Sequence, residues 1–334
     1  MSAPVTAVVV TYREPELGRP AIASLERQTR PPAELLVVAN DPDARDGEFE
    51  SSLPTRVLRP GRNLGYPNSC NVAAAEATQP WLFFLNPDSE AAPDCLERLL
   101  EAADERTAIV GAQVLLPDGT VNAGDNPVHV TGLSWSGRYL EPAEHGSPRE
   151  TAAVSGAALI TRTAVFRDLG GHVPAFFLYV DDTDMAWRAR MAGHEVVFCP
   201  AATVSHDYEF DKGLSKWRHL EHNRLWMVLS NYSGLTLALL APLLVAAEAA
   251  IALQARRDGW WREKREAWRD LFRARRDVAR WRRQVQSARA VGDRAIVERM
   301  RGEMETPLVE SRVLPRVNHW MEIYRRAVLR LLPR

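Results

Sequence analysis

The sequence has only three cysteines among its 334 residues, Cys70, Cys95 and Cys199. Their number is odd and none lies in a CxxC pair, which argues against a disulfide framework and against a zinc knuckle. We therefore expect a protein of the reducing cytoplasm. No basic segment precedes the first apolar run at the amino terminus, so we expect no secretory signal.

Glycine-rich phosphate loops are also missing. Neither G-x-x-x-x-G-K-[ST] nor G-x-G-x-x-G occurs, which argues against a P-loop NTPase and against a dinucleotide enzyme. The composition is otherwise that of a globular protein, with 46% hydrophobic and 25% charged residues.

The formal net charge of -1 hides a strong asymmetry along the chain. Residues 256–334 carry 22 Arg or Lys against 11 Asp or Glu, a local charge of +11, whereas the preceding residues carry -12. A basic segment of this kind favours anionic partners such as phospholipid or nucleic acid. An acidic body binds polyanions poorly unless a metal mediates the contact.

Short apolar runs alternate with helical segments in the first part of the chain. Val5–Thr11, Leu35–Ala39, Thr55–Leu58 and Trp81–Leu85 are typical of buried strands. This alternation predicts an α/β fold with a mostly parallel sheet, and ligand chemistry at the carboxyl ends of the strands. Further strands are expected near Ile109–Leu116, Ala158–Ile160 and Glu195–Cys199, and helices at Ile22–Gln28, Asn71–Ala77, Thr163–Leu169 and Asp182–Ala192.

Two possible metal ligands follow predicted strands. Asn86-Pro87-Asp88 comes directly after Trp81–Leu85, where a carboxylate at the sheet rim can bind a divalent cation and leave positions for phosphate oxygens. The alternative is a turn that caps the next helix. His206 follows Pro200 and the last predicted strand; it is either a structural histidine or a partner of Asp88 for Mg²⁺ or Mn²⁺.

A cluster of acids follows the aromatic run Phe176–Val180 at a predicted helix start. Partial desolvation beside such a run suits Asp181 or Asp182 to act as a general base. The alternative is that these acids only cap the helix and complement its dipole. Asp184 is the member that we expect to be structural.

Polar residues at other strand ends predict a nucleotide crevice. Each is explained singly by turn chemistry, but jointly they can clasp a base and ribose, and Arg62 can meet a phosphate with two hydrogen bonds. The candidates are Thr11, Tyr12, Glu14, Asn40, Asp41, Arg62, Asn63, Gly65, Asn86 and Asp88.

Several ordered blocks resemble glycosyltransferase family 2, the inverting enzymes with a GT-A fold, and particularly its bacterial rhamnosyltransferase-like branch. The blocks span roughly residues 5–230 and are VVVTYRE, NLGYPNSCN, FFLNPDSE, SGAALITRTAVFRDLGGHVPAFFLYVDDTDMAWR and AGHEVVFCPAATVSH. The chain departs from the family in having Asn40-Asp41 where Asp-Asn is usual, and Asn-Pro-Asp in place of Asp-x-Asp.

This resemblance implies a sugar-nucleotide donor, with Thr11, Tyr12 and Glu14 bordering the nucleotide. It also implies a divalent metal, Mg²⁺ or Mn²⁺, held by Asp88, with His206 as a further metal or diphosphate contact. Asp182, from the pair Asp181-Asp182, is by the same analogy the catalytic base.

We expect a GT-A catalytic domain over residues 1–215, with a nucleotide half over about 1–105 and an acceptor half over about 106–215. A helical, Trp- and Arg-rich extension over residues 216–334 follows it. 

Within this extension, Leu235–Leu253 is apolar except for Thr236, Pro242 and Glu248, and just reaches the length of a membrane span. Two interpretations stay open. One is a membrane-surface anchor with Trp260 and Trp261 at the headgroups, and the other is a helical packing or dimerisation domain.

The predicted function is inverting transfer of a sugar from a dTDP-rhamnose-like or UDP-sugar donor to a hydroxyl of a lipid-linked or cell-envelope glycan. The predicted location is the inner face of a bacterial plasma membrane. A homodimer through the C-terminal helices is a further expectation, and a nucleic-acid partner is disfavoured. The alternatives are a non-catalytic membrane-associated subunit or scaffold and, less favoured, a sugar nucleotidyltransferase. That family resembles chains with a Gly-rich loop after the first strand, whereas Thr11–Pro15 contains no glycine.

Overall fold

The computed structural model describes residues 2–13, 16, 18–43, 49–206, 213–305 and 314–333. The chain divides into two compact units. The first, called the sheet unit below, comprises residues 1–126, 136–189 and 194–209. The second, called the helical unit, comprises residues 127–135, 190–193 and 210–334.

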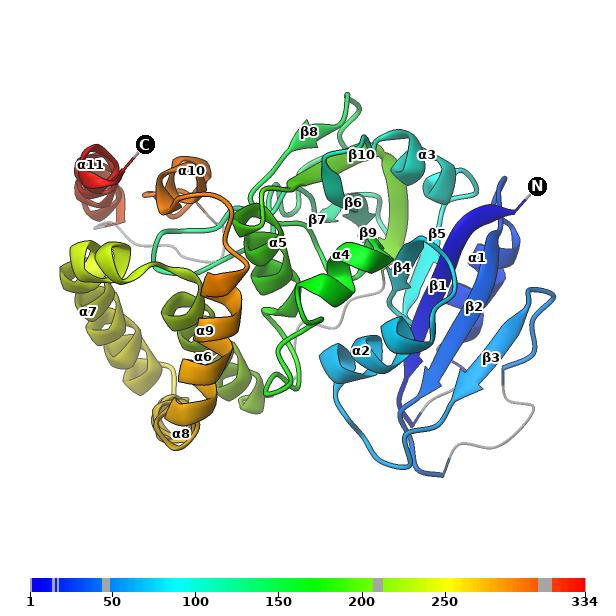
Figure 1. The fold of residues 1–334 in the computed structure, drawn as a ribbon, viewed down its shortest axis with the longest axis horizontal. Coiled ribbons are helices and arrows are strands. Elements are labelled where there is room, and N and C mark those ends of the chain that lie inside the picture. Colours follow the sequence, from blue (N-terminus) through cyan, green and yellow to red (C-terminus); the bar gives the residue numbers. More distant parts are fainter. Residues whose placement is uncertain are drawn as a thin grey trace. The chain divides into compact units, whose positions relative to one another are not determined.

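The described residues of the sheet unit form one ten-stranded mixed sheet, with strand order β3-β2-β1-β4-β9-β6-β10-β5; β7 pairs with β6 and β8 with β10 (Figure 1). The strands are β1 (Ala3–Thr11), β2 (Pro32–Ala39), β3 (Thr55–Leu58), β4 (Trp81–Leu85), β5 (Ser89–Ala91), β6 (Thr107–Leu115), β7 (Val121–Ala123), β8 (Arg149–Glu150), β9 (Ala158–Arg162) and β10 (Glu195–His206). The predicted α/β class is confirmed. β1 to β4 are parallel, but β9 runs antiparallel to β4 and β6, so the sheet is mixed beyond β4.

The helices of the sheet unit are α1 (Gly18–Glu26), α2 (Tyr66–Glu76), α3 (Cys95–Glu101), α4 (Thr163–Asp168) and α5 (Asp181–Met191). Every residue of β4 is buried, and so is β1 from Val5 to Thr11. A strand covered on both faces needs such a continuous apolar run, which is why the predicted bounds of β4 coincide with the observed ones. The predicted bounds of β3 also coincide with the observed ones, although this edge strand is only partly buried.

β10 is longer than predicted, because Pro200 does not end it. The pairing of β10 with β6 shifts register between Cys199 and Thr203, and the missing N–H of Pro200 falls in this irregular stretch. Gln113 Nε2 donates to the carbonyl of Pro200 at 3.0 Å. His206 is consequently the last residue of the strand and pairs with Ser89 of β5, a strand that the sequence did not predict.

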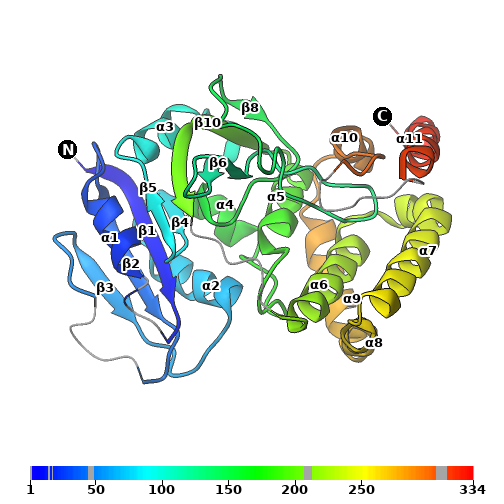
Figure 2. The same ribbon diagram turned by 180° about the vertical axis from the view of Figure 1, so that it is seen from behind.

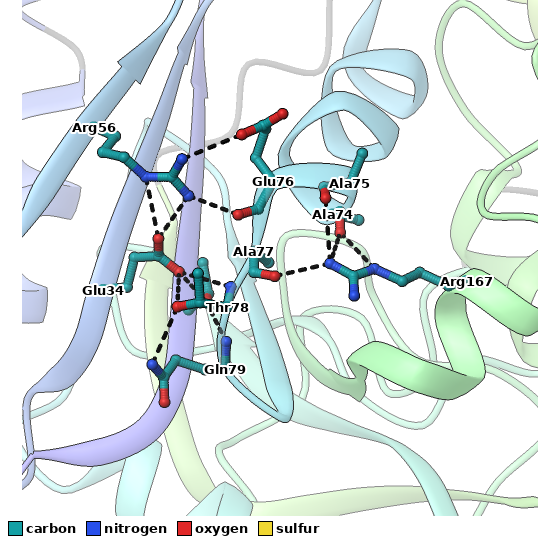
Figure 3. A network of polar contacts seen from close by, with 10 residues as sticks. Glu34, Arg56, Ala74, Ala75, Glu76, Ala77, Thr78, Gln79 and Arg167 are labelled. Carbon is teal, nitrogen blue, oxygen red and sulfur yellow. Dashed lines mark hydrogen bonds and ion pairs between the residues drawn. The ribbon is translucent and has the colours of Figure 1, made fainter.

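Two arginines hold the C-terminal end of α2 (Figure 3). Arg56 of β3 donates to the carbonyl of Glu76 at 2.6 Å, and Arg167 of α4 donates to the carbonyls of Ala74 and Ala77. Cations at this end satisfy carbonyls that have no helical partner. Arg56 also forms an ion pair with Glu34 of β2 at 2.7 Å. The C-terminal end of α2, away from Gly65 at its start, is therefore tied to the sheet.

The helical unit contains α6 (Ser215–Asn231), α7 (Gly234–Arg257), α8 (Trp261–Arg273), α9 (Arg275–Ser287), α10 (Asp293–Arg299) and α11 (Leu314–Leu331), as Figure 2 also shows. The helical C-terminal extension is as predicted. The unit also includes residues 127–135, which the sequence did not associate with it. The Tyr232 hydroxyl donates to the carbonyl of Val130 at 2.9 Å, and Val130 N–H donates to Arg301.

α7 is long and apolar enough to cross a membrane by length and composition. Its one acidic residue, Glu248, makes an ion pair with Lys264 of α8 at 2.8 Å and another with Arg224 of α6. One side of α7 therefore faces protein. The expectation that Trp260 lies at lipid headgroups is wrong, because this side chain is 4% exposed and stacks on Trp217 at a centroid distance of 4.7 Å.

Candidate active site

The structure brings Asp88 and His206 into direct contact. Asp88 lies between β4 and β5, and His206 ends β10, which pairs with β5 at Ser89. His206 Nε2 lies 3.0 Å from Asp88 Oδ1, and the two side chains are 4% and 27% exposed. The short strand β5 thus places a carboxylate and an imidazole together at the rim of the sheet.

The other ring nitrogen of His206 suggests how the imidazole is oriented. Nδ1 lies 3.4 Å from Asn122 Oδ1 of β7. With the ring proton on Nδ1, the lone pair of Nε2 faces the Asp88 carboxylate. Two acceptors at 3.0 Å need a proton or a cation between them, so this arrangement suits a divalent metal.

Asp182 is held at both carboxylate oxygens by the start of α5 and by the turn before β9. Gly156 N–H donates to Oδ2 at 2.8 Å, and Thr183 N–H donates to Oδ1 at 2.6 Å. A Cβ added to Gly156 would lie 3.3 Å from Asp182 Cβ, so glycine gives the close approach of this turn. The carboxylate is therefore fixed in one orientation.

Asp181 lies beside it and is buried. Burial, together with the charges of Asp182 and Asp184, raises the pKa of Asp181 to about 8. Burial also raises the pKa of Asp182, against the hydrogen bonds from Gly156 and Thr183 that favour its ionised form. The raised pKa of Asp181 thus favours its protonated form, whereas the hydrogen bonds to Asp182 favour the ionised form of that carboxylate. Asp184 is structural, as expected, because it forms a buried ion pair with Arg188 at 2.7 Å.

Backbone pairing connects the Asp88–His206 pair to Asp182. Leu85 of β4 is opposite Ala158 of β9, and Asn86 N–H donates to the carbonyl of Ala157 at 2.8 Å. Gly156, which binds Asp182, is the next residue along. The turn 155–157 therefore links Asp182 to the exit of β4, two residues before Asp88.

Tyr66, at the start of α2, contacts the same turn. Its hydroxyl donates to the carbonyl of Gly156 at 3.2 Å, and its backbone N–H donates to Phe177 at 3.1 Å. A small cavity beside it is lined by Asp181, Asp182, Tyr66 and Gly156 among mostly apolar side chains. Sequence reasoning missed Tyr66, Gly156, Thr183 and Asn122, because their partners are distant in the chain or belong to a backbone group.

The backbone just before the acids is strained. Tyr179 and Val180 have φ of 71° and 67°, in the left-handed region that β-branched residues avoid. The preceding residues are clamped by α2, since Asn68 Nδ2 donates to the carbonyl of Phe176 at 3.0 Å. Strain of this kind persists only where the surroundings fix it, and it is concentrated at functional sites.

The predicted nucleotide residues have different surroundings. Thr11 ends β1 and is buried, and Asn40 uses its amide to bind Asn63 at 2.8 Å and Leu64 N–H at 2.9 Å. Asn63 Oδ1 in turn accepts from Gly65 N–H. Asn40 and Asn63 thus hold the loop that leads into α2, rather than pointing freely into solvent.

The remaining candidates are more open. Tyr12 is 42% exposed beneath the Arg13 guanidinium, and Asp41 accepts from Asp43 N–H in a local turn. Arg62 is exposed and makes no hydrogen bond or ion pair with the part of the chain that the structure describes. Asn86 pairs with Ala157 as stated above, and Glu14 lies outside the described residues.

This fold and site define a class of enzyme. The sheet is that of GT-A glycosyltransferases, and residues 6–170 match the family described as Glycosyl transferase family 2. The chain belongs to glycosyltransferase family 2 and is a glycosyltransferase.

The chain is also similar in sequence to proteins of two named organisms. The chain is 28% identical over 289 residues to the N-acetylglucosaminyl-diphospho-decaprenol L-rhamnosyltransferase of Mycobacterium tuberculosis, covering 76% of this chain and 85% of that protein. It is 31% identical over 217 residues to the O-antigen biosynthesis protein RfbC of Myxococcus xanthus, covering 60% of this chain and 17% of that protein.

Solved structures show the same fold at low identity. S. aureus TarS 1-349 in complex with UDP matches with a TM-score of 0.53 at 14% identity, over 99% of this chain and 89% of that chain. GalNAc-T7 with UDP, GalNAc and Mn²⁺ matches with a TM-score of 0.57 at 15% identity, over 70% of this chain and half of that chain.

Proposed function

We propose that this enzyme transfers a sugar, with inversion, from a nucleotide-diphosphate sugar to a hydroxyl of a polyprenyl-linked glycan on the cytoplasmic side of a bacterial membrane. The observation that carries the proposal is Asp182, fixed at both oxygens and linked through one turn to the strand exit that bears Asp88. The name of the Mycobacterium tuberculosis relative supports L-rhamnose as the sugar and a diphospholipid acceptor.

Asp182 is the proposed base. Its partly desolvated carboxylate, with a raised pKa, accepts the proton of the acceptor hydroxyl. The acceptor oxygen forms its bond to the anomeric carbon from the face opposite the diphosphate, and the bond from that carbon to the diphosphate oxygen breaks. The proton ends on Asp182, the electron pair leaves with the nucleoside diphosphate, and the configuration is inverted.

Asp88 and His206 would hold a divalent cation, Mg²⁺ or Mn²⁺. The donor set fits, because Nε2 and the carboxylate face each other while Asn122 orients the ring. Among the described residues no group of three or more His, Cys, Asp or Glu is placed to hold a metal. The other positions thus suit diphosphate oxygens and water, the usual partners of Mg²⁺. When bound, the cation supplies positive charge that stabilises the leaving diphosphate.

The base assignment is tested with Asp182→Asn. We expect the donor Kd to stay within about threefold, while kcat falls by about a thousandfold or more, because the amide accepts no proton. Calorimetric titration of the donor beside a transfer assay measures both. Asp168→Asn, the same change at an exposed position of α4, is the matched control. Near-normal turnover of Asp182→Asn would reject the assignment.

The metal assignment is tested with Asp88→Ala. The wild-type donor affinity is expected to fall when a chelator is added, and the variant affinity is expected to be low with or without chelator. A variant that keeps the wild-type response to Mn²⁺ would contradict the role of Asp88.

A thermal-shift screen of UDP-, GDP- and dTDP-sugars identifies the base of the donor, because a ligand that binds only the folded chain raises its Tm.

A further inference from the structure

α7 has an exposed face without polar side chains. Its exposed positions from Leu235 to Leu253 are Leu, Ala, Pro and Val only, and Val245 is 69% exposed. The opposite side faces protein through Glu248, Leu240 and Ala255. Contiguous apolar surface of this extent marks an interaction site on a folded protein.

α11 carries a second exposed apolar stripe. Val317, Trp320 and Leu331 recur at helical spacing on one side, and Trp320 is 69% exposed. Met321 and Val328 are buried and lie next to this stripe around the helix. α11 therefore has apolar residues on its exposed surface as well as on its buried surface.

The two stripes adjoin. The Tyr324 hydroxyl of α11 donates to the carbonyl of Leu239 of α7 at 2.7 Å. Tyr324 lies four residues after Trp320 and seven before Leu331, on the same helix side, and Leu239 lies four residues after Leu235. Figures 1 and 2 show α7 and α11 at one margin of the helical unit, with α6 and α9 across α7 from that margin. We call this surface the α7–α11 face; it comprises Leu235, Val245, Leu253, Val317, Trp320 and Leu331.

The charges around the α7–α11 face select its partner. The exposed charged residues of α11 are Arg316, Arg326 and Arg330, of which Arg326 is ion-paired with Glu322. α7 ends in the exposed Arg256 and Arg257, which the exposed Asp258 follows. Arg256 lies over the ring of Trp261 at 4.2 Å. A second copy would bring these like charges together, which costs binding energy. Anionic lipid headgroups would neutralise them, and a Trp with flanking Arg residues is typical of helices that lie in a bilayer interface.

We propose that the α7–α11 face docks this enzyme on an anionic bilayer surface, with α7 lying in the interface rather than crossing it. The contacts of Glu248 with α6 and α8 keep one side of α7 on the protein, as this orientation requires. The proposal gives the acceptor class of the proposed function a physical basis, but its test reads lipid binding alone and is independent of turnover.

The test is flotation of the full chain with vesicles of phosphatidylcholine, with and without one-quarter phosphatidylglycerol. We expect binding to the anionic vesicles that high salt weakens. Arg316→Gln with Arg330→Gln is expected to lower it about 30-fold, at about fivefold for each arginine near the surface. Arg276→Gln with Arg283→Gln, at two exposed arginines of α9, is the charge-matched control.

Val245→Asp with Trp320→Asp is expected to abolish binding to the anionic vesicles, whereas Leu140→Asp, at an exposed leucine of the sheet unit, leaves it unchanged. Circular dichroism melting checks that each variant folds. Equal binding by the arginine variant overturns the proposal. So does a concentration-dependent dimer without vesicle binding that Val245→Asp dissociates, or a chain that resists high salt and alkaline extraction from membranes.

Discussion

At the residue scale, two adjacent aspartates have different surroundings. The oxygens of Asp182 accept three hydrogen bonds from Gly156 and Thr183, which favour its ionised form. Asp181 is buried between like charges, and its pKa is raised to about 8. Groups of one kind whose environments separate their pKa values can take different roles in one reaction. Asp182 is thus suited to accept a proton and Asp181 to keep one.

The raised pKa of Asp181 predicts a pH dependence of stability. Because the folded chain binds this proton more tightly than the unfolded chain, whose ordinary value is 3.8, the free energy of unfolding falls as pH rises from about 4 to about 8. Asp181→Asn removes this contribution. We expect the variant to gain stability over wild type progressively between pH 5 and pH 8, measured by urea unfolding. The exposed Asp168→Asn should show no such trend, and a constant difference for Asp181→Asn would contradict the prediction.

Tyr66 is predicted to be a positioning residue. Its hydroxyl holds the carbonyl of Gly156, whose N–H holds Asp182. Tyr66→Phe removes one hydrogen bond, worth about 1 kcal/mol. We expect kcat to fall about fivefold with the donor Kd unchanged, and the acidic limb of the pH–rate profile to move as Asp182 loses its fixed orientation. A fall in stability with an unchanged pH profile would show a purely structural role.

At the element scale, the start of α2 positions the segment before Asp181. Gly65 has φ of 77°, and a Cβ there would lie 2.2 Å from the carbonyl oxygen of Phe177. Tyr66 N–H binds the same oxygen. The helix start therefore fixes the segment that contains the strained Tyr179 and Val180.

Gly65→Ala and Gly61→Ala separate backbone strain from this close approach. Both glycines have left-handed φ, but a Cβ at Gly61 would meet nothing within 4 Å. We expect Gly61→Ala to cost about 1 kcal/mol of unfolding free energy and Gly65→Ala about 3 kcal/mol or more, with loss of turnover, because Phe177 must move. Urea unfolding and the transfer assay measure the two effects. Equal costs at both positions would contradict the prediction.

At the scale of the whole molecule, buried strands were the most predictable part. β4 begins and ends where its apolar run does, because both of its faces are covered. β3 has the predicted bounds as well, although it is a partly exposed edge strand. Asp88 and His206 could be expected at one rim of the sheet, because each follows a predicted strand. Their contact through β5, and the passage of β10 through Pro200, depend on register, which local sequence does not encode.

The same limit applies to the partition of the chain. Residues 127–135 belong to the helical unit through contacts with Tyr232 and Arg301, about a hundred residues or more away in sequence. Trp260 has the composition of an interfacial residue but stacks on Trp217 inside the unit. Apolar composition predicted that these helices bury surface somewhere, and only the packing distinguishes protein from solvent as the neighbour.

Within the helical unit, a buried ionic cluster joins α6, α7 and α8. Lys264 of α8 is fully buried and pairs with Glu221 of α6 and Glu248 of α7, and Arg224 pairs with the same two carboxylates. These cations lower the pKa of both glutamates despite burial, which alone would raise it. Removing one cation would leave a carboxylate without compensation.

Lys264→Met is therefore expected to lower the unfolding free energy of the helical unit by about 3–5 kcal/mol at neutral pH, the usual cost of breaking a buried ion pair. The loss should shrink as pH falls and the glutamates take up protons. Lys216→Met, the same change at a half-exposed lysine, should cost under about 1 kcal/mol. Urea unfolding followed by tryptophan fluorescence measures both variants. Because the proposed donor residues lie in the sheet unit, the Lys264→Met variant should still bind the donor at urea concentrations below its unfolding transition. A stability loss that does not depend on pH would contradict the prediction, since packing rather than charge would then hold α8.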